Sequence, residues 1–201
     1  MMNTITLRAA GLGILCLMAG CTSTPLRYYT LQPPPASPLV VAPPAYQFQL
    51  LPVTVPAAVD REERVVRQDL SSLAVLEGER WAAPLGEEVR AMLAADVARR
   101  LGTPNLDALP RGAGQPLVRA RLVLQRFDVW PGGQAAIEAG WTLSRADASE
   151  QAKQQCTAEF SRAAPLDGEG QVAALQTLLA QLSARLAASV QAYAAGQAGC
   201  G

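Results

Sequence analysis

The four cysteines of this 201-residue chain are the residues with the most informative chemistry: Cys16, Cys21, Cys156 and Cys200. A thiol can act as a nucleophile, bind a metal, form a disulfide or accept a lipid. Nucleophilic catalysis by cysteine ordinarily needs a histidine as base, and the sequence contains no histidine. Its absence also excludes Ser–His–Asp catalysis and any zinc site that needs imidazole.

Paired carboxylates are the other candidate for chemistry, because two of them can cleave a glycosidic bond. Glu62 and Glu63 lie in the charged segment 60–67. Adjacent residues of a strand point to opposite faces, so this pair is not expected to flank one bond. The segment instead predicts a solvated strand edge whose charges pair with one another. The sequence also has no glycine-rich phosphate loop and no metal-ligand spacing, so we expect no catalytic, cofactor or metal site.

The N-terminal residues indicate a secretory signal. Arg8 is the only charge before Cys21, and it is followed by the apolar run Ala9–Ala19. The segment Leu17–Cys21 resembles a bacterial lipobox, with Met18 in the place usually taken by leucine. The resemblance implies that Cys21 is acylated and becomes the mature N-terminus. The alternative is an ordinary secretory signal that happens to end near a cysteine.

The sequence divides into three parts on this interpretation. Residues 1–20 are a lipoprotein signal peptide, 21–44 an acylated N-terminus followed by a proline-rich tether, and 45–201 a single α/β domain. Thr22 follows the acylated cysteine. By analogy with enterobacterial sorting, a threonine there permits delivery to the outer membrane.

The remaining cysteines predict a disulfide. Cys16 leaves with the signal, so Cys156 and Cys200 form the one available pair in an oxidising compartment. Cys156 begins a strand on its apolar face, and a helix over about 169–194 should return antiparallel across that strand, which brings Cys200 close. The alternative is a buried free Cys156 with a reactive thiol in the tail.

Hydrophobic periodicity predicts an α+β fold. Alternating patterns indicate half-buried strands over 117–127, 135–144 and 154–162, and shorter ones over 46–55, 59–68 and 72–77. Helical spacing indicates helices over 84–101 and 169–194. We expect a two-layer sandwich: a mainly antiparallel sheet covered on one face by the two helices.

Composition argues against two further classes. Lys+Arg and Asp+Glu both count 17, so no concentrated basic surface for nucleic acid is expected. The polar face of helix 169–194 is mostly Gln, Ser and Ala with Arg185, so its apolar stripe is interpreted as core rather than a membrane-surface helix. Trp141 alternates inward and is assigned to the core, whereas Trp130 at a strand–turn junction hints at a contact surface.

Five short motifs occur in order along the mature chain. They are Tyr28–Leu31, Leu51–Pro56, Val59–Arg61 with Val65–Arg67, Arg80–Leu85 and Gln125–Asp128. Their order and spacing resemble the ABC-type transport auxiliary lipoproteins. The sequence departs from the family after Asp60-Arg61, where Glu62-Glu63 replaces the usual Pro-Gln. Arg61 and Trp81 lie in these motifs and are given no role beyond structure.

The resemblance implies a non-enzymatic protein, held to the outer membrane by acyl chains and facing the periplasm. Its partners would be a periplasm-spanning protein with MCE domains and, in some systems, an ABC permease, with lipid as the cargo. Assembly into a ring of identical copies would follow by analogy. A generic envelope-scaffolding lipoprotein is the alternative, and an envelope hydrolase is disfavoured by the missing histidine.

Overall fold

The computed structural model describes residues 25–35, 43–107, 110, 112, 114–145 and 153–200. The predicted signal peptide, Cys21 and Thr22 lie outside them. In chain order the elements are β1 (Arg27–Tyr29), β2 (Gln47–Leu50), β3 (Glu63–Arg67), β4 (Leu73–Trp81), α2 (Leu85–Leu101), β5 (Leu117–Val129), β6 (Gln134–Arg145), β7 (Gln154–Ala163) and α3 (Gly168–Ala194).

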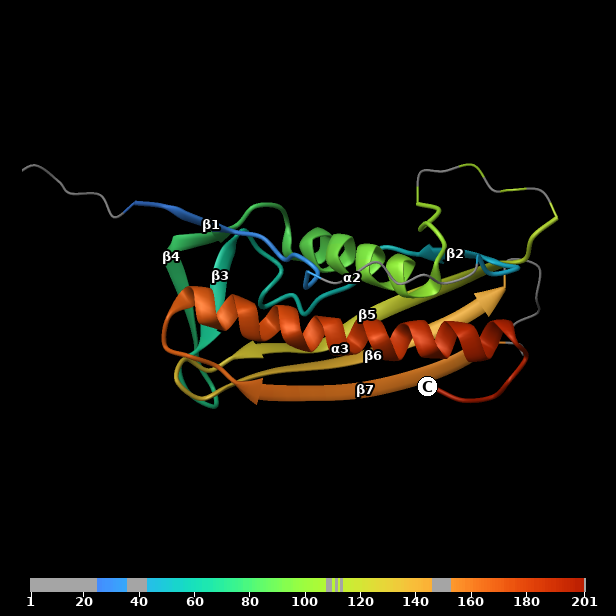
Figure 1. Cartoon of the computed structure of the whole chain (residues 1–201). Helices are drawn as coiled ribbons and strands as arrows, with labels where there is room; N and C mark the ends of the chain where they lie inside the picture. Colours follow the sequence, from blue (N-terminus) through green and yellow to red (C-terminus); the bar gives the residue numbers. More distant parts are fainter. Residues whose placement is uncertain are drawn as a thin grey trace, which may run out of the picture.

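The larger sheet has four strands in the order β2-β5-β6-β7. β5, β6 and β7 pair antiparallel, and β2 adds to β5 in parallel. Both helices lie on one face of this sheet, side by side (Figure 1). The predicted α+β class, with a mainly antiparallel sheet under two helices, is confirmed.

A second sheet, which the sequence did not indicate, has three strands in the order β1-β4-β3. β3 and β4 form an antiparallel hairpin, and β1 pairs with β4 in parallel. This sheet stands at one end of the four-stranded sheet (Figure 1). Residues 27–29, which fall within the predicted acylated N-terminus and tether, therefore pair in this sheet, and the proline-rich stretch lies between β1 and β2 in the sequence.

Both helices have local signals at their ends. Pro84 precedes α2, and Gly102, at φ 67°, ends it in the left-handed conformation that glycine adopts most easily. The carboxylate of Asp167 caps α3 by accepting a hydrogen bond from the Gly170 amide at 2.7 Å. Among the described residues, neither helix combines the length and hydrophobicity needed to cross a membrane.

The core lies between the helices and the four-stranded sheet. The helical stripes of α2 and α3 are buried, as are the inward residues of β5 and β6. Trp141 is buried, which confirms its assignment to the core. Each large aliphatic side chain buried in this way contributes about 1.5–3 kcal/mol, so this interface dominates the stability of the fold.

Candidate functional site

The candidate site is the end of the molecule where the chain enters the fold. The described chain begins at Pro25, and β1 runs from Arg27 to Tyr29 beside Glu79–Trp81 of β4. Only residues 22–26 separate β1 from Cys21, whose acylation remains a prediction. A lipid at Cys21 would therefore be attached to the fold through β1. The contacts between β1 and the rest of the fold determine how rigid that attachment is.

Arg64 of β3 is the centre of these contacts. Its side chain is only 2% exposed, although it comes from the charged segment 60–67. Its guanidinium lies 4.8 Å from the centroid of the Tyr29 ring and 5.8 Å from that of Trp81. It also forms an ion pair with Glu79 and donates a hydrogen bond to Gln171 Oε1 at 2.9 Å. One cation thus joins β1, β3, β4 and α3.

Gly168, the first residue of α3, leaves room for this arrangement. A Cβ built there would lie 2.6 Å from Tyr29 Oη, 2.8 Å from Arg64 Nη1 and 3.0 Å from a Glu79 oxygen. The Arg64 cluster, defined as Arg64, Tyr29, Glu79, Trp81 and Gln171, is therefore closely packed. The predicted solvated edge is wrong at Arg64, because strand alternation turns this residue inward.

Glu88 of α2 forms hydrogen bonds with the residues that directly follow β1. One of its carboxylate oxygens accepts hydrogen bonds from the Thr30 hydroxyl and the Leu31 amide, both at 2.8 Å. The Glu88 side chain is buried, and Leu31 packs in the core. The segment that follows the predicted anchor is thus held by α2 as well as by the Arg64 cluster.

Glu62 and Glu63 pair with arginines, but the predicted pairing within segment 60–67 is confirmed only for Arg61 and Glu63, since Glu62 pairs with Arg80 of β4. Arg80 lies 3.1 Å from a Glu62 oxygen and 3.7 Å from a Glu63 oxygen, and Arg61 donates to Glu63 at 3.0 Å. A backbone hydrogen bond and the Arg61 guanidinium hold the pKa of Glu63 below its usual range. The expectation that the two carboxylates diverge is wrong, because Glu62 precedes β3 and both converge on Arg80.

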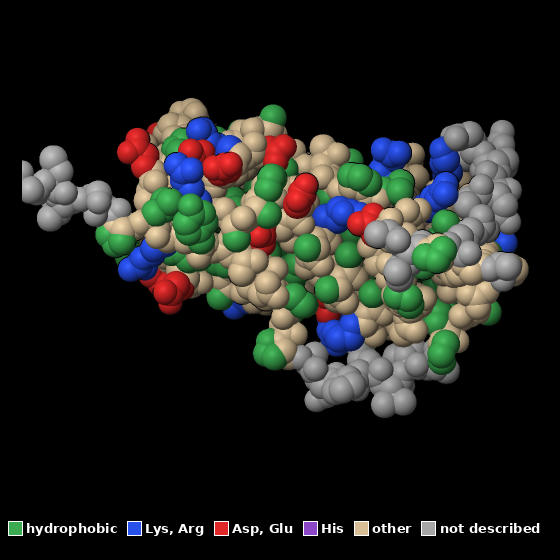
Figure 2. Space-filling view, turned by 90° about the horizontal axis from the view of Figure 1, so that it is seen from above, with side chains coloured by type: hydrophobic (Ala, Val, Ile, Leu, Met, Phe, Trp, Pro, Cys, Tyr) green, Lys and Arg blue, Asp and Glu red, His purple; other side chains and the backbone are tan. Residues whose placement is uncertain are grey.

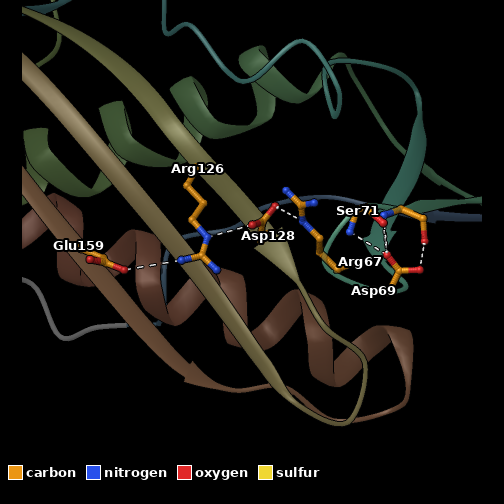
Figure 3. Close-up of polar contacts among 7 residues, drawn as sticks. Arg67, Asp69, Ser71, Arg126, Asp128 and Glu159 are labelled. Atoms are coloured by element: carbon orange, nitrogen blue, oxygen red, sulfur yellow. Dashed lines mark hydrogen bonds and ion pairs between the residues drawn. The ribbon is translucent and has the colours of Figure 1, made fainter.

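A chain of charges connects the two sheets on the side away from the helices (Figure 3). Asp128 of β5 accepts from Arg67 of β3 at 3.2 Å and from Arg126 at 2.9 Å. Arg126 also lies 3.6 Å from Glu159 of β7. Asp128 therefore ties the β3–β4 hairpin to the large sheet.

Asp69 closes the tip of that hairpin (Figure 3). Its carboxylate accepts hydrogen bonds from the hydroxyls and the amides of Ser71 and Ser72, at 2.6–2.9 Å. The Ser72 hydroxyl and the Ser71 amide contribute most to a pKa for Asp69 that is far below its usual range. The local sequence signal for this turn is Asp69-Leu70-Ser71-Ser72, because an Asp side chain readily bonds the backbone two residues further on.

Cys156 and Cys200 are joined by a disulfide in the structure, with a Cα–Cα distance of 5.5 Å. Cys156 is buried on β7, and α3 runs back over that strand. The Ser189 hydroxyl donates to the Cys200 carbonyl at 2.7 Å and fixes the tail against α3. The disulfide lies near the C-terminal end of α3, whereas the Arg64 cluster lies near its N-terminal end.

The described residues contain no group of three or more His, Cys, Asp or Glu side chains that could hold a metal ion. Trp130 is only half-buried and its amide bonds Gln134, so it is part of the β5–β6 turn. The site consists of β1, which the Arg64 cluster and Glu88 hold in place, and of the exposed face of the β1-β4-β3 sheet.

Solved structures show the same fold. A crystal structure of an uncharacterized protein matches with a TM-score of 0.65 and 19% identity, over 83% of this chain and 99% of that one. A protein from Xanthomonas campestris of the DUF330 family matches with a TM-score of 0.59 and 18% identity, over 80% of this chain and 92% of that one. No curated protein sequence matches.

A family model settles the membership that the motifs suggested. The model of the ABC-type transport auxiliary lipoprotein component matches residues 29–187, which include every element from the end of β1 to most of α3. This is a family of lipid-anchored envelope proteins that assist transport, not a family of enzymes. The chain belongs to the ABC-type transport auxiliary lipoprotein family.

Proposed function

We propose that this protein is an outer-membrane lipoprotein that faces the periplasm and serves as an accessory to an MCE/ABC-type system for lipid transport between membranes. It acts by docking a periplasm-spanning MCE-domain partner rather than by catalysis. The observation that carries the proposal is the family match over residues 29–187, which covers nearly all of the folded chain.

The proposed anchor is the acylated Cys21. Each buried CH₂ contributes about 0.8 kcal/mol, and one acyl chain holds a protein only marginally, so a stable anchor needs more than one. The fold suits such an attachment. β1 begins shortly after Cys21, and the Arg64 cluster and Glu88 hold it in place.

A docking role agrees with the side chains of the site. The chain has no histidine, and its candidate carboxylates Glu62 and Glu63 are paired with Arg80 and Arg61. Carboxylates neutralised in this way are poor acids and bases for a hydrolase. We therefore propose no catalytic activity.

Affinity purification tests the proposal. The full chain, tagged at its C-terminus and expressed in its own cells, is extracted in detergent and its companions are identified by mass spectrometry. We expect enrichment of an MCE-domain protein. The matched control is the Cys21→Ser variant, which should leave the membrane fraction and lose that enrichment.

Two other results would count against the proposal. Capture of envelope proteins without any MCE-domain protein would favour a scaffolding lipoprotein with no transport role. An unchanged distribution of lipids between the two membranes in a deletion strain would support the same alternative.

A further inference from the structure

The outer face of the β1-β4-β3 sheet is defined by the strand register. Tyr28 and Glu63 both lie opposite Arg80, and Val65 lies opposite Val75. Their chain neighbours Tyr29, Arg64 and Trp81 point inward to the Arg64 cluster. Glu63 and Val65 alternate with buried Arg64 on β3, and directly opposite residues share a face, so their partners Arg80 and Val75 lie with them on the side away from the core. A register shift between Glu63 and Arg64 accounts for the odd spacing of Val75 and Arg80 on β4.

This outer face carries exposed apolar side chains. Tyr28 is 64% exposed, Leu26 43% and Val75 40%. A groove next to Val75 is lined by residues 75–79 of β4 and by Pro25 and Arg27, which alternate along the chain with Leu26 and Tyr28. Figure 2 shows hydrophobic side chains among charges of both signs at the end where the chain enters.

The length of chain outside the described fold limits what can cover this face. Only residues 22–26 connect Cys21 to β1, and a fully extended chain spans at most about 3.6 Å per residue. β1 therefore lies within about 20 Å of an acylated Cys21. The polar layer of one leaflet is itself about 5–8 Å thick, so β1 is kept close to the bilayer surface.

We infer that the outer face of the β1-β4-β3 sheet rests on the lipid surface of the membrane that holds Cys21, with Leu26, Tyr28 and Val75 in the interfacial region. This inference rests on the proposed lipid anchor. Tyrosine is suited to the position, because its ring is apolar and its hydroxyl stays hydrated.

The charges of the face indicate that the contact is apolar rather than electrostatic. Arg80 and Arg61 both form ion pairs with Glu63, and Glu77, two residues after Val75 on β4, adds a second acid. A surface with balanced charge gains little from anionic lipid. Docking on the membrane should therefore depend weakly on salt and on the fraction of anionic lipid.

Quenching by brominated lipid tests the contact. Tyr28→Trp and, as a matched control, Val123→Trp on the exposed face of β5 are made in the full lipoprotein, which is purified in detergent and reconstituted into phosphatidylcholine vesicles brominated near the headgroup end of the acyl chains. Unchanged urea unfolding shows that each variant folds. After subtraction of the wild-type signal, we expect severalfold stronger quenching at position 28 than at position 123.

The remaining outcomes separate the docking from the anchor. Protein that does not float with the vesicles overturns the anchor and the docking with it. Protein that floats but is quenched equally at both positions overturns the docking alone. If neither brominated lipid nor acrylamide quenches the tryptophan at position 28, the face is covered by a second copy of the chain, and the docking on lipid is overturned. Quenching that is abolished by salt overturns the apolar contact.

Discussion

The guanidinium of Arg64 lies 4.8 Å from the centroid of the Tyr29 ring, and this contact joins the first strand of the fold to β3. β1 has only three residues, too few to hold itself in a sheet by backbone hydrogen bonds alone. The Arg64 cluster supplies what the short strand lacks. Its loss should therefore affect both the stability of the fold and the attachment of β1.

Replacement of Arg64 by methionine should destabilise the protein by about 2–4 kcal/mol, because Glu79 and Gln171 lose their partner inside the fold. Chemical unfolding in urea measures the effect. Arg67→Met is the matched control, since Arg67 is more exposed and its ion pair with Asp128 should contribute less than about 1 kcal/mol. Equal losses in the two variants would show that Arg64 has no special role.

Glu88→Ala should release the segment after β1. Its carboxylate accepts two hydrogen bonds from Thr30 and Leu31, so its removal leaves a buried amide without an acceptor and should cost about 1–3 kcal/mol. Hydrogen exchange should accelerate at the Leu31 amide in particular. Glu87→Ala is the control, because Glu87 lies in the same helical turn but is exposed. Unchanged exchange at Leu31 would contradict the assignment.

The parts of the fold with long periodic patterns could be predicted from the sequence. The alternation over β5, β6 and β7 and the stripe of α3 each extend over ten or more residues, so the period is unambiguous. The second sheet could not be predicted in this way. β1 is too short to show a period, and its parallel pairing with β4 joins segments about 50 residues apart, a relation that no local pattern contains.

The candidate site was predicted only in part. Arg64 stands among six other charges in 60–69, and composition alone indicates solvent. Its burial depends on Tyr29, on Trp81 and on Gln171, which is 107 residues away. The one local signal was alternation with Val66, which is also buried. The convergence of Glu62 and Glu63 was missed because alternation holds only within a strand, and β3 begins at Glu63.

Asp69 should titrate at a pH far below that of an ordinary aspartate. The hydrogen bonds from Ser72 and Ser71 favour its ionised form in the folded protein and thereby lower its pKa. Because the folded pKa is depressed, the stabilisation is complete above the unfolded pKa of about 3.9 and is lost as the pH falls through the folded value. Carboxyl chemical shifts measured by NMR during an acid titration report this pKa.

Removal of the two hydroxyls provides the control for Asp69. In Ser71→Ala/Ser72→Ala the backbone amides remain as donors, so the pKa of Asp69 should rise part of the way toward its ordinary value. The variant should therefore lose hairpin stability at neutral pH and show a smaller loss on acidification than the wild type. A pKa for Asp69 that does not move would attribute the shift to other groups.

The disulfide between Cys156 and Cys200 should add to the stability of the C-terminal half of α3. It closes a loop with a sequence separation of 44, for which the chain-entropy model gives about 4 kcal/mol. Cys156→Ser/Cys200→Ser should therefore unfold at a lower urea concentration by an equivalent amount, and wild-type protein treated with reductant should behave like the double variant. Alkylation of unreduced protein followed by mass spectrometry checks the bond directly. Two modified thiols in protein isolated from the envelope would contradict the pairing, and the tail after α3 would then be held by Ser189 without a covalent link.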